Sequence, residues 1–446
     1  LKFVGGSVMV DMGSVQLEEG GVRVCGIPVK TRGCFGSGTS EAFAAWRDVL
    51  GAVAEPAQEV IRLVHCPRQS GGRHQQDVLV PAAAVGGEGE QKAWIQEVNT
   101  RATANTHPRR LLVFINPASG AGNAEATWKA ARAVLAPLPW IRLEEVVTQR
   151  INDAYGRCQA LDLATVDGIV IVSGDGLVHE VVNGLFARPD HKEALKIPIG
   201  HIPGGSGNGL CKSVCWVSGE EAGVVDAAFL VAQGVTKGLH LMQVDMPDLP
   251  PKVSFLALSG GVISDIDLES ESLRFLGGAR FTVYAVYRVI APRALRCAEL
   301  SYLPATAPDP GPPVSLDTPL KPEDGWVTTS GDLAVFWACN TPWMTLSDCP
   351  APTVDMGSPV WHVTLLRGTD RMPLLKYLLG LENGIQEDHP GVDLLKCRAL
   401  RLRPEAGAEG HFSLDGEEVP FGPIQMWPLT TGQVMAGEPV PAASRL

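Results

Sequence analysis

The chain has 446 residues, more than a single hydrophobic core usually holds, so two or three domains are expected. Hydrophobic residues make up 45% and charged residues 19%, which is typical of a globular protein, and 49 Gly with 34 Pro predict many loops. The formal charge of −12 argues against sequence-independent nucleic-acid binding, which needs clustered Lys and Arg.

Membrane and redox signals are weak. No apolar run approaches the ~20 residues of a membrane-spanning helix. The chain begins at Leu1, and its first residues do not have the pattern of a signal peptide. Ten Cys are scattered without a pair of CxxC motifs; Cys211 and Cys215 lie four apart, but no further metal ligands are near. We therefore expect buried free thiols and a cytoplasmic protein.

Residues 1–106 are expected to form a β-rich module and a linker. Short apolar runs such as SVMVDM and VRVCGI predict strands. The stretch KAWIQEVNTRA, with Trp94, Ile95 and Val98, predicts an amphipathic helix. Short strands followed by one helix are compatible with a pleckstrin-homology-like module and equally with an unrelated β-rich cap.

Residues 107–237 are expected to form an α/β domain with a parallel sheet. The apolar run Leu111–Ile115 is typical of a strand buried on both faces. Strand and helix then alternate four times over residues 111–216, with one helix expected over Asn152–Leu163. This alternation predicts βαβ units with crossover helices.

Residues 238–446 are expected to form a mainly antiparallel β-sandwich domain. Seven apolar segments, from HLMQVDM to HFSLDGEEVP, read as strands with few helices between them. The stretch from Pro304 to Gly331 is rich in Pro and predicts a surface loop.

Three Gly-rich turns follow predicted parallel strands, at residues 116–122, 173–176 and 203–209. In open α/β sheets, ligands bind at the carboxyl ends of the strands. Exposed backbone N–H groups and the following helix N-termini suit phosphate. Each turn alone is explained by local geometry, and the third only loosely resembles a dinucleotide fingerprint. Together, the three turns predict a phosphate-rich ligand.

Asp175 lies between two of these glycines, just after a buried strand. Its carboxylate would suit a general base for an attacking hydroxyl, or a ligand for Mg²⁺. The alternative is that Asp175 only caps the helix that follows. Spacing alone does not decide between these interpretations.

Two further segments carry charge. Residues 265–271, DIDLESE, are densely acidic and precede Arg274 and Arg280. The acids would suit a cationic amine or a metal, and the arginines would suit phosphate, but a solvated helix start explains them as well. The run Asp415 to Glu418 predicts a hairpin turn, because Asp-Gly is a strong turn signal.

These five segments, in this order, resemble the sphingosine kinases, within the wider group of diacylglycerol-kinase-like lipid kinases. The matching motifs are SGDGLVHEVVNGL, PGGSGNGL and above all DIDLESE followed by RFLGGARF. The resemblance covers residues 109–300 well and returns at 411–418, and its look is closer to the plant-type long-chain base kinases than to animal forms.

The resemblance implies a role for each matching residue. Asp175 would be the general base that takes the proton of a primary hydroxyl. The substrate would be bound by Ser173, Gly174, Asp175, Gly176 and Asp267, with Asp267 holding the sphingoid amine or hydroxyl. ATP would be contacted by Asn116, Pro117, Ala118, Thr148, Gln149, Arg150, Ile151, Asn152, Glu180, Gly205, Ser206, Gly207, Arg274, Arg280, Asp415, Gly416 and Glu417.

The implied cofactors are ATP and Mg²⁺, whose protein ligands stay unassigned. The implied partners are a long-chain base and a membrane surface that the protein would bind peripherally, with a homodimer as an open alternative. Two departures stand out: ASGAGN lacks the usual adjacent glycines and basic residue, and Gly204 replaces the more usual Ala or Cys. Alternatives are a ceramide or diacylglycerol kinase, a soluble nucleotide kinase such as an NAD kinase, and a non-catalytic lipid-binding scaffold.

Overall fold

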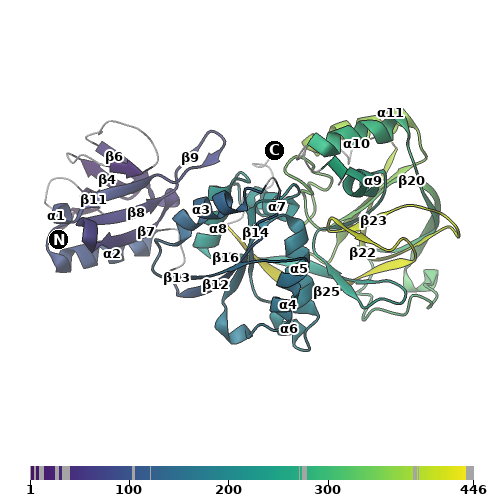
Figure 1. Cartoon of the computed structure of the whole chain (residues 1–446), viewed down its shortest axis with the longest axis horizontal. Helices are drawn as coiled ribbons and strands as arrows, with labels where there is room; N and C mark the ends of the chain where they lie inside the picture. The colour runs from purple at the N-terminus through teal and green to yellow at the C-terminus, as the bar shows by residue number, and fades with distance from the viewer. Residues whose placement is uncertain are drawn as a thin grey trace.

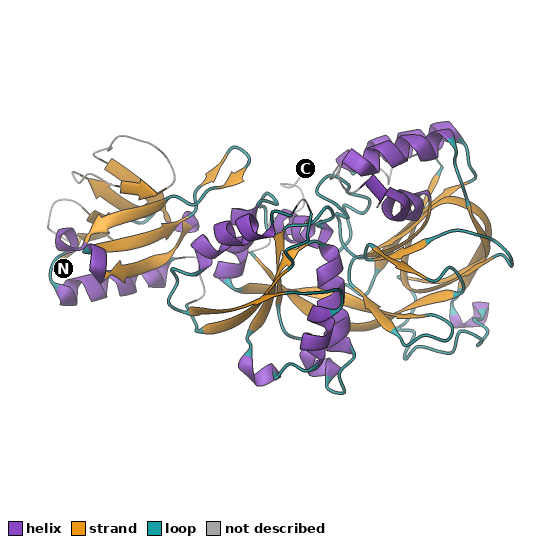
Figure 2. Cartoon of the chain, in the orientation of Figure 1, coloured by secondary structure: helices purple, strands orange, loops and turns teal. Residues whose placement is uncertain are grey.

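The structure is a computed structural model, and it describes residues 2–4, 7–9, 15–25, 30–32, 41–102, 106–120, 122–270, 272–273, 279–384, 389 and 391–437. Three parts follow one another along an elongated molecule (Figure 1): a small β-rich module, a central α/β domain, and a β-rich domain that carries three helices on one side. Colouring by secondary structure separates the helix-covered central sheet from the two strand-rich ends (Figure 2).

The N-terminal module packs two antiparallel sheets and a helix around one core. Trp94 and Val98 of the helix are buried in that core, as the sequence predicts. Asn99 fastens the helix to a strand, because its side chain accepts from the amide of Ala52 and donates to the carbonyl of the same residue. The elements are β1 (Lys2–Val4), β2 (Ser7–Met9), β3 (Val15–Leu17), β4 (Gly21–Cys25) and β6 (Glu41–Ala45) in one sheet, β5 (Lys30–Arg32), β11 (Asp77–Pro81), β8 (Val60–His65) and β7 (Val49–Glu55) in the other, and the helices α1 (Ala82–Val85) and α2 (Glu88–Arg101).

A small hairpin, β9 (Arg68–Gln69) and β10 (Gly72–Arg73), joins this module to the central domain. The Arg73 guanidinium is buried between Glu220, at 2.8 Å, and Asp48, at 2.8 Å. Its backbone amide donates to Asp226, and its side chain lies 3.7 Å from the ring centroid of Phe229. Removing one partner of a buried ion pair typically costs about 3–5 kcal/mol, so this contact fixes the module against the central domain.

The central domain is built on four parallel strands in the order β13–β12–β14–β15. All six residues of β14 are buried, which is why they form a continuous apolar run. The elements are β12 (Arg109–Ile115), α3 (Ala124–Leu135), β13 (Ile141–Val147), α4 (Asp153–Gln159), β14 (Gly168–Ser173), α5 (Asp175–Phe186), α6 (His191–Ala194), β15 (Ile199–Pro203), α7 (Gly209–Val217) and α8 (Val224–Gln233).

The helix expected over Asn152–Leu163 is shorter than predicted. Its first observed residue is Asp153, and its last is Gln159. Three residues after the helix ends, Asp162 starts a separate turn, because its carboxylate accepts from the amide of Ala164. Side-chain capping competes with helix continuation at such positions.

The sheet does not stop at β15. The last strand of the chain, β25 (Ile424–Ala436), joins β15 in parallel through Ile199 and Val434. It then pairs antiparallel with β16 (Val235–Asp245) along its whole length. The expected parallel sheet is therefore one part of a larger mixed sheet, and β16 and β25 run from the central domain into the β-rich domain.

The β-rich domain encloses its own core of buried apolar residues, among them Trp361, Phe336 and Phe412. Strands β19 and β21 each pair with both β20 and β22, so these four strands close on themselves. The remaining elements are β17 (Lys252–Ser254), β18 (Ala257–Gly261), α9 (Val262–Glu269), α10 (Ala279–Ile290), β19 (Leu295–Pro304), β20 (Val327–Cys339), β21 (Trp361–Arg367), α11 (Arg371–Gly380), β22 (Val392–Pro404), β23 (Phe412–Leu414) and β24 (Glu417–Val419).

Eight of the cysteines in the described part of the chain, from Cys66 to Cys397, are free and buried, as expected. Cys211 and Cys215 both lie on the inner face of α7, without further metal ligands in the described residues around them. None of the described helices is long and apolar enough to cross a bilayer.

Candidate active site

The three Gly-rich turns meet at the carboxyl ends of β12, β14 and β15. A Cβ atom added to Gly205 would lie 2.3 Å from the Cα of Gly174, and one added to Gly120 would lie 2.7 Å from the carbonyl oxygen of Gly204. Only glycine lets backbones approach so closely. The turns that looked separate in the sequence therefore form one surface of backbone, and contact between the turns explains the glycines at positions 120, 174 and 205.

Asn208 holds the third turn in shape. Its Oδ1 accepts from the amides of Gly204 and Gly205, both at 3.1 Å, and its Nδ2 donates to the carbonyl of Gly205. Within the described residues, the amides of Ser206 and Gly207 have no protein acceptor. Backbone N–H groups without a protein acceptor, at the start of a helix, are suited to an anion.

Asp175 lies where the second and third turns touch. Its carboxylate accepts from the amides of Gly209, at 2.8 Å, and Leu210, at 3.1 Å, which are the first two residues of α7. Asp175 therefore caps a different helix from the one it begins, so the expected capping role is found on α7 rather than α5. Its buried position raises the pKa of the Asp175 carboxyl, although His201 and the two amides oppose that rise.

The segment from Thr148 to Asn152 forms one lip of this surface, just beyond β13. Thr148 is buried and bonded to the carbonyl of Ile115 at the end of β12. Ile151, by contrast, is 84% exposed. Glu180 of α5 faces the start of α4. Burial raises the pKa of the Glu180 carboxyl, and this effect is larger than the lowering by the backbone amides around Asn152. Glu180 and the segment that was expected to follow adenosine thus lie together.

Ser173 and the first turn are linked at the centre of the surface. The Ser173 hydroxyl donates to that of Ser119 at 3.1 Å, and both side chains are buried. In the first turn, Asn116 Oδ1 accepts a hydrogen bond from the amide of Ala118 at 3.0 Å. Ser173 therefore joins the strand ends of β12 and β14 rather than standing free.

The Asp415–Gly416 turn joins β23 and β24 into the expected hairpin. The Asp415 carboxylate is buried and accepts hydrogen bonds from the Ser254 hydroxyl and from the amides of residues 255–257. It also lies 3.0 Å from His179 Nδ1. Its bonding joins the hairpin to β17 and β18 and to α5. Glu417, in contrast, is exposed. It lies beside the second turn, because a Cβ atom added to Gly176 would be 2.5 Å from its Oε1.

The acidic segment lies next to this hairpin, on α9. The Ser413 hydroxyl, two residues before Asp415, donates to Asp267 Oδ2 at 2.6 Å. Arg280 is buried in the first turn of α10. Arg274 lies outside the described residues. The structure therefore brings Asp267 next to β23 of the hairpin, whose other strand carries Glu417 beside the second turn.

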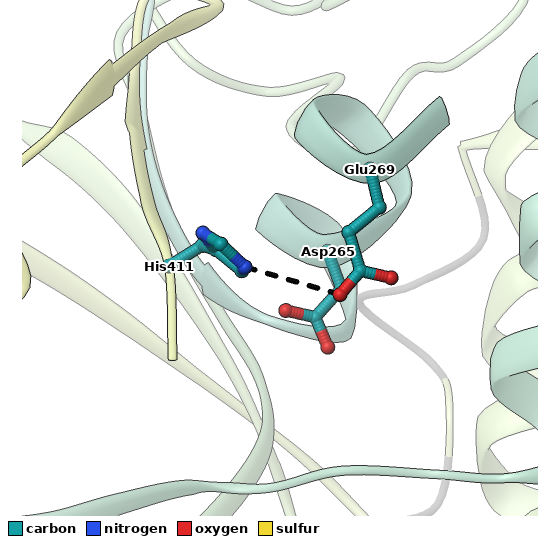
Figure 3. A group of neighbouring side chains, drawn as sticks. All are labelled: Asp265, Glu269 and His411. Atoms are coloured by element: carbon teal, nitrogen blue, oxygen red, sulfur yellow. Dashed lines mark ion pairs between the residues drawn. The ribbon is translucent and has the colours of Figure 1, made fainter. Parts of the chain in front are cut away.

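Asp265, Glu269 and His411 form a tight group of possible metal ligands, with donor atoms within 4.8 Å of one another (Figure 3). Two cations already balance the two carboxylates, because the buried Arg288 pairs with Glu269 and lies 3.3 Å from Asp265, and Arg293 lies 3.4 Å from Glu269. A fixed guanidinium repels a cation, so the group does not fit Mg²⁺. Glu417 fits better, since Mg²⁺ is usually bound through substrate phosphates and one or two carboxylates.

Sequence reasoning missed the contacts that His179 and His201 make. His179 lies one helical turn after Asp175, and this four-residue spacing is the only feature of the sequence that could have placed His179 at the site. His201 reaches Asp175 from the neighbouring strand, which no local pattern indicates.

Comparisons with known proteins agree with this geometry. Residues 110–244 match the family model of the diacylglycerol kinase catalytic domain. A crystal structure of a diacylglycerol kinase from Bacillus anthracis aligns with a TM-score of 0.50 at 15% identity, covering 74% of this chain and 97% of that one. The low identity makes this a likeness of fold alone.

Two curated relatives align over most of their length. Sphingosine kinase 1 of Arabidopsis thaliana is 29% identical over 355 residues, which cover 74% of this chain and 73% of that protein. Sphingosine kinase 1 of Homo sapiens is 31% identical over 332 residues, which cover 70% and 86%. The expected resemblance is confirmed: this chain belongs to the sphingosine kinase family of lipid kinases.

Proposed function

We propose that the chain transfers the γ-phosphate of ATP to the primary hydroxyl of sphingosine or a related long-chain base, giving the 1-phosphate and ADP. The observation that carries this proposal is the position of Asp175, whose buried carboxylate lies where the Gly-rich turns after β14 and β15 meet. Phosphoryl transfer needs positioning, charge neutralisation and a base. The backbone amides and Asp175 are suited to these tasks.

In this mechanism, the amides of the first and third turns bind the phosphates, and the Thr148–Asn152 lip follows the nucleotide. Asp175 takes the proton from the hydroxyl as the phosphoryl group transfers in line. Mg²⁺ would neutralise phosphate charge when bound, and the exposed carboxylate of Glu417 would hold it. Three other carboxylates near the surface, those of Asp175, Glu180 and Asp415, accept from donors of the protein.

The test is ATP-dependent phosphate transfer to a panel of sphingosine, phytosphingosine, ceramide, diacylglycerol and NAD. We expect transfer to the two free bases. Transfer to ceramide or diacylglycerol instead would keep the base and the fold but overturn the head-group assignment. Transfer to NAD alone would make the chain a soluble nucleotide kinase.

Asp267→Asn is expected to lower kcat/KM for sphingosine about 10- to 100-fold, because a hydrogen bond to a charged group contributes about 1.5–3 kcal/mol. The KM for ATP should stay within about twofold, since the head-group contact is separate from the phosphates. Asp324→Asn, in the exposed proline-rich loop, serves as the matched control. Equal losses for ATP and sphingosine would contradict the head-group role.

We further propose that the protein works in the cytoplasm and binds membranes peripherally through the outer face of α10. Its four exposed apolar side chains recur at the spacing of one helical face. The neighbouring α11 adds two more. These side chains, each at least 48% exposed, are Val283, Val286, Tyr287, Ile290, Met372 and Leu379. A single apolar face of this kind marks an interaction surface.

The double variant Val286→Glu with Ile290→Glu is expected to weaken binding to phosphatidylcholine vesicles at least about tenfold, because each buried apolar side chain contributes about 1.5–3 kcal/mol. Vesicle co-sedimentation measures the effect. Leu249→Glu, at an exposed apolar position in the loop after β16, is the control. Unchanged binding of the double variant would rule out this face.

A further inference from the structure

A buried histidine lies next to Asp175. His201, on β15, lies opposite Ile171 of β14, and its ring is almost completely buried. Its Nε2 lies 2.9 Å from the carbonyl oxygen of Ser173. A carbonyl only accepts, so Nε2 carries the proton and Nδ1 has the lone pair of the neutral ring.

Nδ1 of His201 points at the base. It lies 3.8 Å from Asp175 Oδ1, and within the described residues it has no hydrogen-bond partner although it is buried. A buried polar atom without a partner is uncommon and asks for an explanation. The nearest group that gains a proton during the proposed reaction is Asp175 itself.

We propose that His201 is a positioning residue for the proton that Asp175 receives, an inference that rests on the proposed function. The substrate O–H bond breaks and its proton moves to Asp175 as the oxygen attacks phosphorus. The two side chains then move from 3.8 Å to hydrogen-bond distance, and the new O–H of Asp175 donates to Nδ1 of His201. The proton leaves to solvent when Asp175 ionises again after the product departs, so His201 ends as it began.

The surrounding charges favour this arrangement over a resting ion pair. Burial lowers the pKa of His201, which keeps its ring neutral, and burial raises the pKa of Asp175. The only described ionisable group whose charge acts on His201 is Asp175. The largest charges acting on Asp175 are those of His201 and Asp415, and Asp415 is itself bonded to His179. Asp175 and His201 are therefore expected to titrate as a coupled pair.

His201→Gln separates this role from a structural one. The Gln amide can still donate to the Ser173 carbonyl, but it has no basic nitrogen facing Asp175. We expect kcat to fall about tenfold, which is less than the ~10²- to 10⁴-fold that a whole general base contributes. The acid limb of kcat/KM should move to lower pH, because the neutral imidazole Nδ1 is a stronger acceptor for protonated Asp175 than the amide oxygen of Gln. In an Asp175→Asn background, the same substitution should cost nothing further.

His240→Gln is the control, because His240 is also a buried histidine but lies on β16 beside Thr431. Its pH profile should match that of the unmodified protein. A His201→Gln variant whose acid limb does not move would overturn the proposal, whatever its stability. So would an additional loss in the Asp175→Asn background.

An NMR titration of the His201 ring, with and without Asp175→Asn, does not depend on turnover. The charge of Asp175 raises the pKa of His201, so its removal should lower that pKa further. An unchanged titration would refute the coupling even in an active enzyme. If the coupling is seen but no lipid is phosphorylated, the proposed function fails and the contact between the two groups stands.

Discussion

Replacing Asp175 with Asn is expected to lower kcat for sphingosine phosphorylation by at least about 10³-fold, toward the upper end of what general base catalysis supplies. Asn keeps one acceptor for the amides of Gly209 and Leu210 but sets an NH₂ group against the other. Because Asp175 caps α7, the variant should also lose about 1 kcal/mol of stability. Activity therefore has to be compared among proteins shown to be folded by their thermal melts.

Asp226→Asn provides the matched control. Asp226 also accepts from an amide at a helix start, that of Gly223, and from the amide of Arg73 at the junction with the N-terminal module. A comparable loss of stability with retained turnover is expected. If Asp175→Asn keeps its kcat, or if both variants lose activity equally, Asp175 is not the base.

The pH dependence of the unmodified protein follows from the same burial. Burial raises the pKa of Asp175 above the ~4 of an exposed Asp, and the base acts in its ionised form. The acid limb of kcat/KM should therefore lie at higher pH than ~4. The free energy of unfolding depends on pH in the opposite direction to activity. The raised pKa of Asp175 stabilises the folded protein fully below the pKa of the unfolded chain, and this stabilisation is lost as pH rises through the folded-state pKa.

Asp415→Ala is expected to destabilise the folded protein by about 3 kcal/mol or more, because it leaves several buried donors without an acceptor at about 1–3 kcal/mol each. The apparent midpoint of thermal unfolding reports the loss. Asp393→Ala, which removes an exposed pair with Arg367, should cost at most about 1 kcal/mol. The large effect is expected because Asp415 joins the hairpin, β17, β18 and His179.

The same variant separates two roles for Asp415. If its chief task is to contact the nucleotide, Asp415→Ala would raise the KM for ATP and leave the melting midpoint close to that of the Asp393→Ala control. If its chief task is to join the two domains, the midpoint falls and the defects in ATP and lipid use follow together. The five protein contacts of its carboxylate favour the second result.

Local patterns predicted the parts of the site that one turn contains. The apolar run before Gly174 and the glycines around Asp175 indicated a buried strand followed by a tight turn, and both are present. The sequence did not show that Asp175 would cap α7, because that contact joins residues 34 and 35 positions apart. Contacts of this range come from the packing of β14 beside β15, which carries no local signal.

The β-rich domain was predicted less completely. Residues 279–290 are rich in Val, Tyr and Phe, which favour strands, yet they form α10 because one face packs on α9 and α11. β25 contains Pro428 and Gly432 and was not expected as a strand. It pairs over its length with β16, nearly 200 residues earlier, and that pairing ties the two domains into one sheet.

The most direct test is a structure of this chain with sphingosine and a non-hydrolysable ATP analogue. The account predicts the phosphates against the amides of Ser206 and Gly207, and the primary hydroxyl within hydrogen-bond distance of the Asp175 carboxylate. A nucleotide bound away from the three Gly-rich turns, or a hydroxyl that faces another residue, would contradict it.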